Sequence, residues 1–354
     1  MPTRWGPSVQ IVPVPERVRA FELDPAMPSG ALPIFGEYLD RIGQRLLLWP
    51  FVLVGVGQFF TKTGIALPLG TIALFGFFEV AGIYRRHVRV PETRLKREPF
   101  RQVDIAADGL VVAGRTVGVR LPDGRWLRIR LGEAFRLLLA GHRRVWLLGS
   151  GPKVFAGFPG VVSLRRARVC DGPPANAVVV PPAAWQSGSP RLDPVLAAHR
   201  RRIARGLRAT AAFLLAAAAF ATWVRHDFPT GDHVTGFVTW LSTGCAVAAL
   251  VGAAVAVTRS LAYRRPLPED HWTELRAVLD GPVRMGRRGA ARLSGLTMLA
   301  DGRVIAFRMR KADPSMAANV AATGRLWIAG VPRQGRSAKT GVPGYPVLGT
   351  VWLG

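Results

Sequence analysis

Two glycine-rich segments are the first places in this sequence where chemistry could be expected. Gly149–Lys153 (GSGPK) and Gly335–Thr340 (GRSAKT) superficially resemble loops that bind phosphate through backbone N–H groups. Neither matches the G-x-x-x-x-G-K-[ST] pattern, since Ala338 replaces the glycine before the lysine, and no helix is expected after either segment. We interpret both as turns between strands.

Residues that could bind a metal or act as nucleophiles are scattered along the chain. The stretch Arg225–His233 (RHDFPTGDH) gathers two histidines and two aspartates, side chains that suit a divalent metal. Pro229 and Gly231 also make it a typical turn between helices, and we favour that interpretation. Cys170 and Cys245 stand far apart, without metal-ligand spacing. We predict no catalytic residue, no metal site and no cofactor.

Four apolar stretches stand out against this background. A helix needs about 20 apolar residues to span a bilayer, with a range of roughly 17–25. The four stretches are Leu46–Phe60, Gly64–Tyr84, Gly206–Val224 and Val234–Thr258. The first is short and has to borrow neighbouring residues, whereas the other three have the required length. The sequence therefore predicts two transmembrane helical hairpins.

Arginines flank both predicted hairpins and are sparse in the loops within them. They are Arg41, Arg45, Arg85, Arg86 and Arg89 around the first hairpin, and Arg200, Arg201, Arg202, Arg205, Arg208, Arg259, Arg264 and Arg265 around the second. Such residues mark the cytoplasmic side of a membrane protein. We therefore expect a multi-pass protein of the cell (plasma) membrane, with its N- and C-termini and its middle region in the cytoplasm.

The charge balance of the whole chain fits the same expectation. The 354 residues include 48 Lys and Arg against 22 Asp and Glu, a formal net charge of +26. Nucleic acid would explain such a charge, but it calls for aromatic platforms or a recognition helix away from the bilayer, and we see neither. Anionic headgroups attract basic residues next to a membrane. We expect the anionic inner leaflet as a partner, and no nucleic acid.

Glu79 is the single carboxylate within a predicted span. An ionisable residue in a membrane is a candidate proton or cation site. Arg85 and Arg86 lie within two helical turns, however, so Glu79 can also pair near the cytoplasmic surface. This residue carries the alternative function that we keep, a small transporter or channel component.

The two halves of the chain resemble each other. Five short motifs recur in the same order at offsets of 177 to 184 residues: Tyr84/Tyr263, Pro91/Pro268, Asp123/Asp301, Trp146/Trp327 and Gly157/Gly341. Alternating apolar and basic residues surround Asp123-Gly124 and Asp301-Gly302, which predicts a β-hairpin in each half. The predicted fold class is an α+β membrane protein that duplicates one unit, a transmembrane hairpin followed by a small cytoplasmic barrel- or sandwich-like β domain.

This organisation gives six predicted segments. They are a flexible N-terminal tail at 1–40, a transmembrane hairpin at 41–84, a β domain at 85–172, a proline-rich linker at 173–198, a second hairpin at 199–258 and a second β domain at 259–354. Alternation places arginines on the wet face of each predicted β-hairpin. The candidate face for an anionic partner is Arg125, Arg128 and Arg130 with Arg303, Arg308 and Arg310. Solvated strand faces are the simpler interpretation of these six residues.

Small residues recur every four positions along the last apolar stretch, at Gly244, Ala248, Gly252 and Ala256. This stripe permits close helix packing, either within its own hairpin or in a homodimer. In composition and layout the chain resembles uncharacterised multi-spanning membrane proteins of actinobacteria, although no diagnostic motif carries that likeness. We expect a non-enzymatic, membrane-anchored scaffold or interaction protein that binds lipid and a cytoplasmic protein partner.

Overall fold

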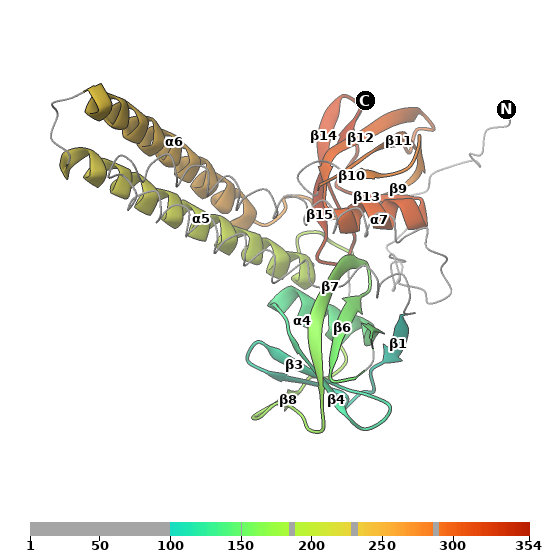
Figure 1. The fold of residues 1–354 in the computed structure, drawn as a ribbon. Helices are drawn as coiled ribbons and strands as arrows, with labels where there is room; N and C mark the ends of the chain where they lie inside the picture. Colours follow the sequence, from blue (N-terminus) through green and yellow to red (C-terminus); the bar gives the residue numbers. More distant parts are fainter. Residues whose placement is uncertain (1–99, 150, 184–187, 228–232, 286–289) are drawn as a thin grey trace.

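Two β domains lie against each other, and a long helical hairpin extends away from the place where they meet (Figure 1). The computed structural model describes residues 100–149, 151–183, 188–227, 233–285 and 290–354. Four helices and fifteen strands lie within these ranges. The helical hairpin separates the two β domains in the sequence.

β domain 1 is an open antiparallel sheet with one helix. Its strands are β1 (Arg101–Asp104), β2 (Leu110–Ala113), β3 (Thr116–Arg120), β4 (Trp126–Arg130), β5 (Arg144–Leu148), β6 (Lys153–Phe158), β7 (Val161–Cys170) and β8 (Val178–Val179). They follow the spatial order β1-β5-β6-β7-β4-β3-β2-β8. Helix α4 (Glu133–His142) turns Phe135, Leu138 and Leu139 into the core, as their helical spacing requires.

β domain 2 closes a barrel. Its strands are β9 (Trp272–Leu279), β10 (Arg284–Met285), β11 (Ala291–Met298), β12 (Val304–Ala312), β13 (Arg325–Ala329), β14 (Arg336–Gly341) and β15 (Leu348–Leu353). The order is β10-β11-β12-β15-β14-β13-β9, and β9 also pairs with β11, so six strands form a ring. Helix α7 (Pro314–Thr323) follows β12. Side chains of the six strands fill the interior, as expected of a small barrel.

The β3–β4 and β11–β12 hairpins have the same local geometry. Val119 faces Leu127 in the first hairpin, and Thr297 faces Ile305, 178 positions later, in the second. In each turn an aspartate accepts the backbone N–H of the arginine two residues on, at 3.1 Å, and a glycine takes a positive φ. Asp-Gly turns favour this connection because glycine reaches positive φ without strain.

The two β domains dock through reciprocal turns. The turn Gly157–Gly160 (GFPG), between β6 and β7, lies on α7, where Asn319 Nδ2 donates to Gly160 O at 2.8 Å. The turn Gly341–Gly344 (GVPG) of β domain 2 lies on the opposite side, against α4 and the start of the helical hairpin. There the rings of Tyr345 and His142 are 4.6 Å apart.

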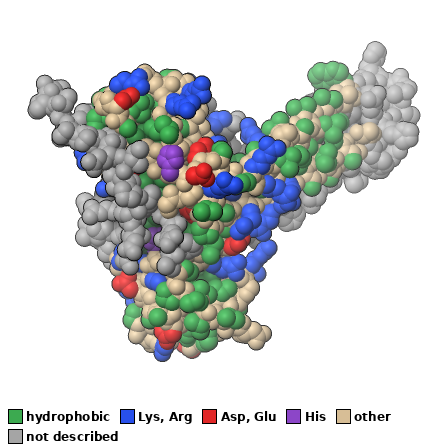
Figure 2. Space-filling view, turned by 180° about the vertical axis from the view of Figure 1, so that it is seen from behind, with side chains coloured by type: hydrophobic (Ala, Val, Ile, Leu, Met, Phe, Trp, Pro, Cys, Tyr) green, Lys and Arg blue, Asp and Glu red, His purple; other side chains and the backbone are tan. Residues whose placement is uncertain are grey.

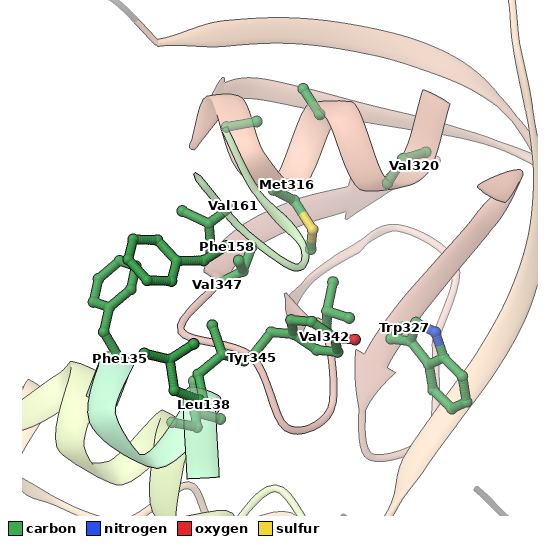
Figure 3. Close-up of a cluster of buried hydrophobic side chains, with 14 of the residues drawn as sticks. Phe135, Leu138, Phe158, Val161, Met316, Val320, Trp327, Val342, Tyr345 and Val347 are labelled. Atoms are coloured by element: carbon green, nitrogen blue, oxygen red, sulfur yellow. The ribbon is translucent and has the colours of Figure 1, made fainter. Parts of the chain in front are cut away.

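Apolar side chains from both domains fill the space between these turns. Figure 3 shows Phe135 and Phe158 of β domain 1 near Met316, Tyr345 and Val347 of β domain 2. The buried residues of both domains belong to one continuous apolar cluster. We therefore treat the two β domains as one packed body.

Asp193 joins this body to the helical hairpin. Its side chain is buried, and it caps the first helix of the hairpin by accepting the Leu196 N–H at 3.0 Å. The second carboxylate oxygen accepts the Gly344 N–H from β domain 2 at 2.7 Å. Burial raises the pKa of this carboxyl, and the backbone N–H donors oppose that effect. One side chain thus holds a helix N-terminus to the opposite domain.

The predicted fold class is wrong. Within the described ranges, fifteen strands form two β-sheets, one of them closed into a six-stranded barrel, beside four helices, which does not fit a duplicated unit of transmembrane hairpin and β domain. Within the described ranges, one segment, Ala246–Arg264, is long and apolar enough to cross a membrane. The predicted multi-pass location in the cell membrane, with its cytoplasmic termini, is contradicted for the same reason. The first predicted hairpin, 41–84, lies outside the described residues.

The physical reason for this error lies in the third apolar stretch. It is part of a helix that begins at Pro194, well before Gly206, and whose first turns pack on the β domains. Alanines supply most of its apolar character, and each buries little surface compared with leucine or phenylalanine. Hydropathy alone therefore could not distinguish this helix from a membrane-spanning helix.

Replacement of Asp193 should destabilise the whole fold. Asp193→Ala removes a helix cap and leaves the buried Gly344 N–H without an acceptor, so we expect the free energy of unfolding to fall by about 2–4 kcal/mol. Denaturant unfolding measures this change. Asp313→Ala is the matched control, because Asp313 caps α7 without bridging the domains, and it should cost about 1 kcal/mol. Equal decreases in the free energy of unfolding for the two variants would contradict the role of Asp193 in joining the hairpin to β domain 2.

His199 should make the fold sensitive to acid. Burial lowers the pKa of His199 to about 4 from its ordinary 6.5, opposed in part by the charge of Asp313. Between these two pH values the unfolded chain binds a proton that the folded chain does not. Stability should therefore fall as pH drops from 6.5 to 4, by about 3 kcal/mol at most. His199→Gln should flatten this part of the stability–pH profile, whereas the same change at exposed His271 should leave it unaltered.

Candidate membrane-binding hairpin

Helices α5 (Pro194–Asp227) and α6 (His233–Arg264) form the hairpin. At 1.5 Å per residue, each is about 50 Å long. Their seam is built from small residues: Ala211 of α5 packs with Ala253 and Ala256 of α6, and Leu214 lies against them. Small side chains let the two helix backbones approach closely.

Polar contacts lock the hairpin at its base. Ser260 Oγ donates to Ala204 O at 3.0 Å. The guanidinium of Arg200, which is buried, donates to the carbonyls of Ala262 and Arg265 and lies over the ring of Tyr263. Lys and Arg side chains commonly satisfy the last carbonyls of a helix in this way. These contacts fix α5 and α6 to each other at the base of the hairpin.

Beyond the base, the hairpin exposes apolar side chains. On α6 they are Trp240, Val247, Leu250, Val251, Val255, Val257 and Leu261, and on α5 they are Phe213 and Leu215; Trp240 is 73% exposed. Figure 2 shows this apolar surface along the hairpin. At 100° per residue the α6 positions span roughly 160° of the helix surface, on the side opposite the seam, which is wider than the stripe of about 100° that usually faces a core. A surface this large and apolar marks a site of interaction with a membrane or a protein.

Exposed arginines encircle the base of the same hairpin. They are Arg201, Arg202, Arg205 and Arg208 on α5, and Arg259, Arg264 and Arg265 at the end of α6. We call these seven residues the arginine collar (Figure 2). Arg201 pairs with Glu133 of α4 at 2.8 Å. Arg205 and Arg208 make no ion pair with the described residues.

Past the collar, charged residues are sparse in the sequence. On α5 the next one after Arg208 is Arg225, which leaves 16 uncharged residues, about 24 Å of helix. On α6 the 25 residues Val234–Thr258 carry no charge, about 38 Å of helix. The hydrocarbon core of a bilayer is about 30 Å thick. The apolar part of the hairpin thus has the length scale of lipid.

The small-residue stripe predicted on α6 divides between two environments. Ala256 is buried in the seam, and a Cβ at Gly252 would lie 3.0 Å from Leu214 Cδ1. Gly244 and Ala248 are exposed, and a Cβ at Gly244 would meet open space. Packing within the hairpin therefore uses Gly252 and Ala256, and a homodimer through the whole stripe stays a prediction.

The predicted anionic-partner face also divides. Arg125 and Arg303 each pair with the aspartate of their own turn, Asp123 and Asp301, at 2.6 and 2.8 Å. The Arg125 side chain lowers the pKa of Asp123, and backbone and side-chain hydrogen bonds from Arg303 lower that of Asp301. Arg125 acts within its turn, whereas Arg303 also donates to Gln334 Oε1 at 3.2 Å.

The other four predicted arginines differ among themselves. Arg128 donates to the carbonyls of Gly172 (3.0 Å) and Pro173 (2.9 Å), so it fixes the chain that leaves β7. Arg130, Arg308 and Arg310 are exposed. They make no ion pair with any residue in the described ranges. Three of the six residues lie on each β domain, as predicted, and binding of an anionic partner by them stays a prediction.

Several predicted sites lie outside the described residues or serve as turns. Glu79 is outside them, and so is the loop at 228–232. Among the described residues, no group of three His, Cys, Asp or Glu side chains could hold a metal ion. The first glycine-rich segment lies between β5 and β6, as the predicted turn requires. Residues 336–340 of the second belong to strand β14, so its interpretation as a turn was wrong. Gly149, Gly151 and Gly335 have positive φ, which is typical of turns.

No protein-family model, curated protein or solved structure matches this chain. The likeness to actinobacterial membrane proteins therefore stays a prediction.

The sequence analysis missed the residues that join the domains to the hairpin, above all Asp193 and Asn319. One signal was available. Asp193-Pro194 and Asp313-Pro314 each place a capping side chain directly before a proline, a combination typical of a helix start. Asn319 gives no such signal, because a polar residue on a short helix is recognisable as an interdomain contact only when both domains are placed.

The seam predicts different outcomes for two glycines of α6. Gly252→Leu would force a side chain into Leu214, and such overpacking costs about 1–3 kcal/mol. Gly244→Leu adds a leucine in open space and should leave stability unchanged or slightly raised, because leucine favours helix over glycine. Thermal unfolding in detergent, followed by helical circular dichroism, compares the two. Similar destabilisation by both substitutions would contradict this seam.

Proposed function

We propose that this chain is a non-enzymatic interaction protein that attaches to a lipid bilayer through the α5–α6 hairpin and presents its paired β domains beside the membrane. The observation that carries the proposal is the juxtaposition of an exposed apolar hairpin with an arginine collar at its base. Lipid tails cover the first, and anionic headgroups match the second.

Exposure distinguishes this hairpin from the core helix of a globular domain. A core helix that is apolar on all sides is buried. Here Val247, Leu250 and Val251 are each at least half exposed, and the helices contact the β domains only at their base. Exposure of apolar surface to water costs a free energy of about 25 cal/mol per Å². This surface therefore favours a cover, and lipid fits because the exposed apolar residues occupy the whole side of α6 opposite its seam.

The collar favours a bilayer over a protein cover. Its arginines lie within about 10 Å of each other along the helix axes, between the β domains and the apolar part of each helix, a depth comparable to that of a headgroup layer. Each Lys or Arg near an anionic surface contributes about 1 kcal/mol. A protein partner would need carboxylates at that level on both helices. The packed β domains, held at the collar by Asp193, would then lie close to the headgroups.

Vesicle flotation tests the attachment. The full chain should float with vesicles that contain phosphatidylglycerol. Val247→Asp combined with Val251→Asp should abolish most of this flotation, because a charge in the hydrocarbon core costs about 2.5–3.5 kcal/mol. Val178→Asp combined with Val179→Asp is the matched control, since these valines are equally exposed but lie on β domain 1, and it should float like the wild type.

A second pair of substitutions tests the arginine collar in the same experiment. Arg205→Gln with Arg208→Gln should weaken binding to anionic vesicles by about 2 kcal/mol, roughly 30-fold, and leave binding to pure phosphatidylcholine unchanged. A chain that stays folded and monodisperse without detergent or lipid would refute the proposal. A lipid-free dimer that the two valine substitutions on α6 dissociate would also refute it, since a second copy would then cover the hairpin.

A further inference from the structure

β domain 1 covers the outer face of its β3–β4 hairpin with its own chain. Pro174 is buried against this face, so that a Cβ at Gly118 would lie 2.7 Å from Pro174 Cδ. Arg128, next to Gly118 across the hairpin, holds the carbonyls of Gly172 and Pro173. The segment then runs on to Val180, whose N–H pairs with Leu110 O. Pro174 therefore covers this face, and the segment then continues as β8 along the edge of β2, where Val178 and Val179 are exposed.

β domain 2 has the equivalent face without the cover. The β3–β4 and β11–β12 registers match at an offset of 178, which places Leu296 where Gly118 stands and Ala306 where Arg128 stands. Leu296 is 42% exposed, and Ala306 is exposed. The chain ends at Gly354, which pairs with Ala306 at the edge of the barrel face. No described residue lies over the equivalent position in β domain 2.

Neighbouring strands extend this uncovered surface. Val278 of β9 pairs with Leu296, and it is 45% exposed. Trp352 of β15 pairs with Arg308, and its ring lies against Gly354, beside Ala306. We call Val278, Leu296, Ala306 and Trp352 the open face. It is an apolar band across four strands, about 14 Å wide at the usual strand spacing.

Arginines border the open face on one side. Arg308 lies opposite Ser294, one row from Leu296, and Arg292 and Arg310 occupy the next row. All three are exposed, and none has an ion pair among the described residues. Tryptophan and arginine are the residues most enriched at the energetic centres of protein interfaces. The charge of this border calls for carboxylates on whatever covers the face.

We propose that the open face binds an extended segment of a protein partner, with proline on the apolar band, as Pro174 lies on the equivalent face of β domain 1, and acidic residues on Arg308 and Arg310. The cover of β domain 1 is the precedent within the same chain. This inference deepens the interaction part of the proposed function. It does not depend on lipid attachment, because the open face belongs to the barrel.

Other occupants fit the surface less well. Single-stranded nucleic acid stacks successive bases on several aromatic rings, and Trp352 is the one aromatic ring of the open face. A membrane would reach the face only if it lay near the hairpin. Figure 1 shows β9 and β11 on the side of the barrel turned away from α5 and α6.

A peptide probe tests the open face. The probe is a fluorescent peptide with the sequence of residues 171–182 (DGPPANAVVVPP) followed by two glutamates. We expect saturable binding to the full chain in detergent micelles, measured by fluorescence anisotropy. Leu296→Asp and Arg308→Glu should each weaken binding about tenfold or more. Val331→Asp and Arg166→Glu, matched exposed positions away from the face, should leave it within about twofold.

The same assay separates the competing occupants. Replacement of the two glutamates by glutamine should weaken binding of the peptide. Unlabelled oligothymidylate and phosphatidylglycerol vesicles should not displace it. Absence of saturable binding, equal binding by all four variants, or displacement by either competitor would overturn the inference. Binding that occurs only after removal of residues 1–40 would assign the face to the chain's own tail, and it would equally overturn a partner protein. Unchanged unfolding transitions of the variants check their folding.

Discussion

The buried carboxylate of Asp193 sets the geometry of the molecule, because one charged group serves two N–H donors that belong to different parts of the fold. One is the first turn of α5, and the other is the Gly341–Gly344 turn of β domain 2. An ionisable group can stay buried only when such partners compensate for the lost water. The direction in which α5 leaves the β domains is therefore coupled to the docking of those domains. The reciprocal turns and the shared apolar cluster complete this arrangement.

A rigid joint has a consequence for the hairpin. The collar arginines lie within the first four turns of α5 and the last two of α6, close to the joint and to each other. If α5 pivoted freely, these arginines and the β domains could not face one surface together. Arg200 and Ser260 add to the constraint from the α6 side. The apolar surface beyond them is exposed and makes few contacts with the described residues.

Local signals in the sequence were sufficient for the β-hairpins and short helices and insufficient for the arrangement of the domains. Asp123-Gly124 and Asp301-Gly302 specify their turns through bonds within a few residues, so pattern alone finds them. Closure of the barrel depends on β9 meeting β11, a pairing that no local pattern encodes. The multi-pass prediction failed because a hydropathy scale scores alanine as apolar whether or not the helix packs on other parts of the protein. Alternation predicts the side of a strand on which an arginine lies, but it cannot predict that Arg128 donates to carbonyls of the following segment.

The two β domains share a hairpin register and differ in what covers it, and this difference follows from chain connectivity. β domain 1 must send its chain onward to α5, and the outgoing segment crosses the outer face of β3–β4 on the way. In β domain 2, no segment among the described residues crosses the equivalent face of β11–β12. Glycine at position 118 suits a covered face, because a larger side chain would meet Pro174. Leu296, by contrast, exposes an apolar side chain that a partner segment can contact. The residues at these equivalent positions thus match the two situations that the connectivity creates.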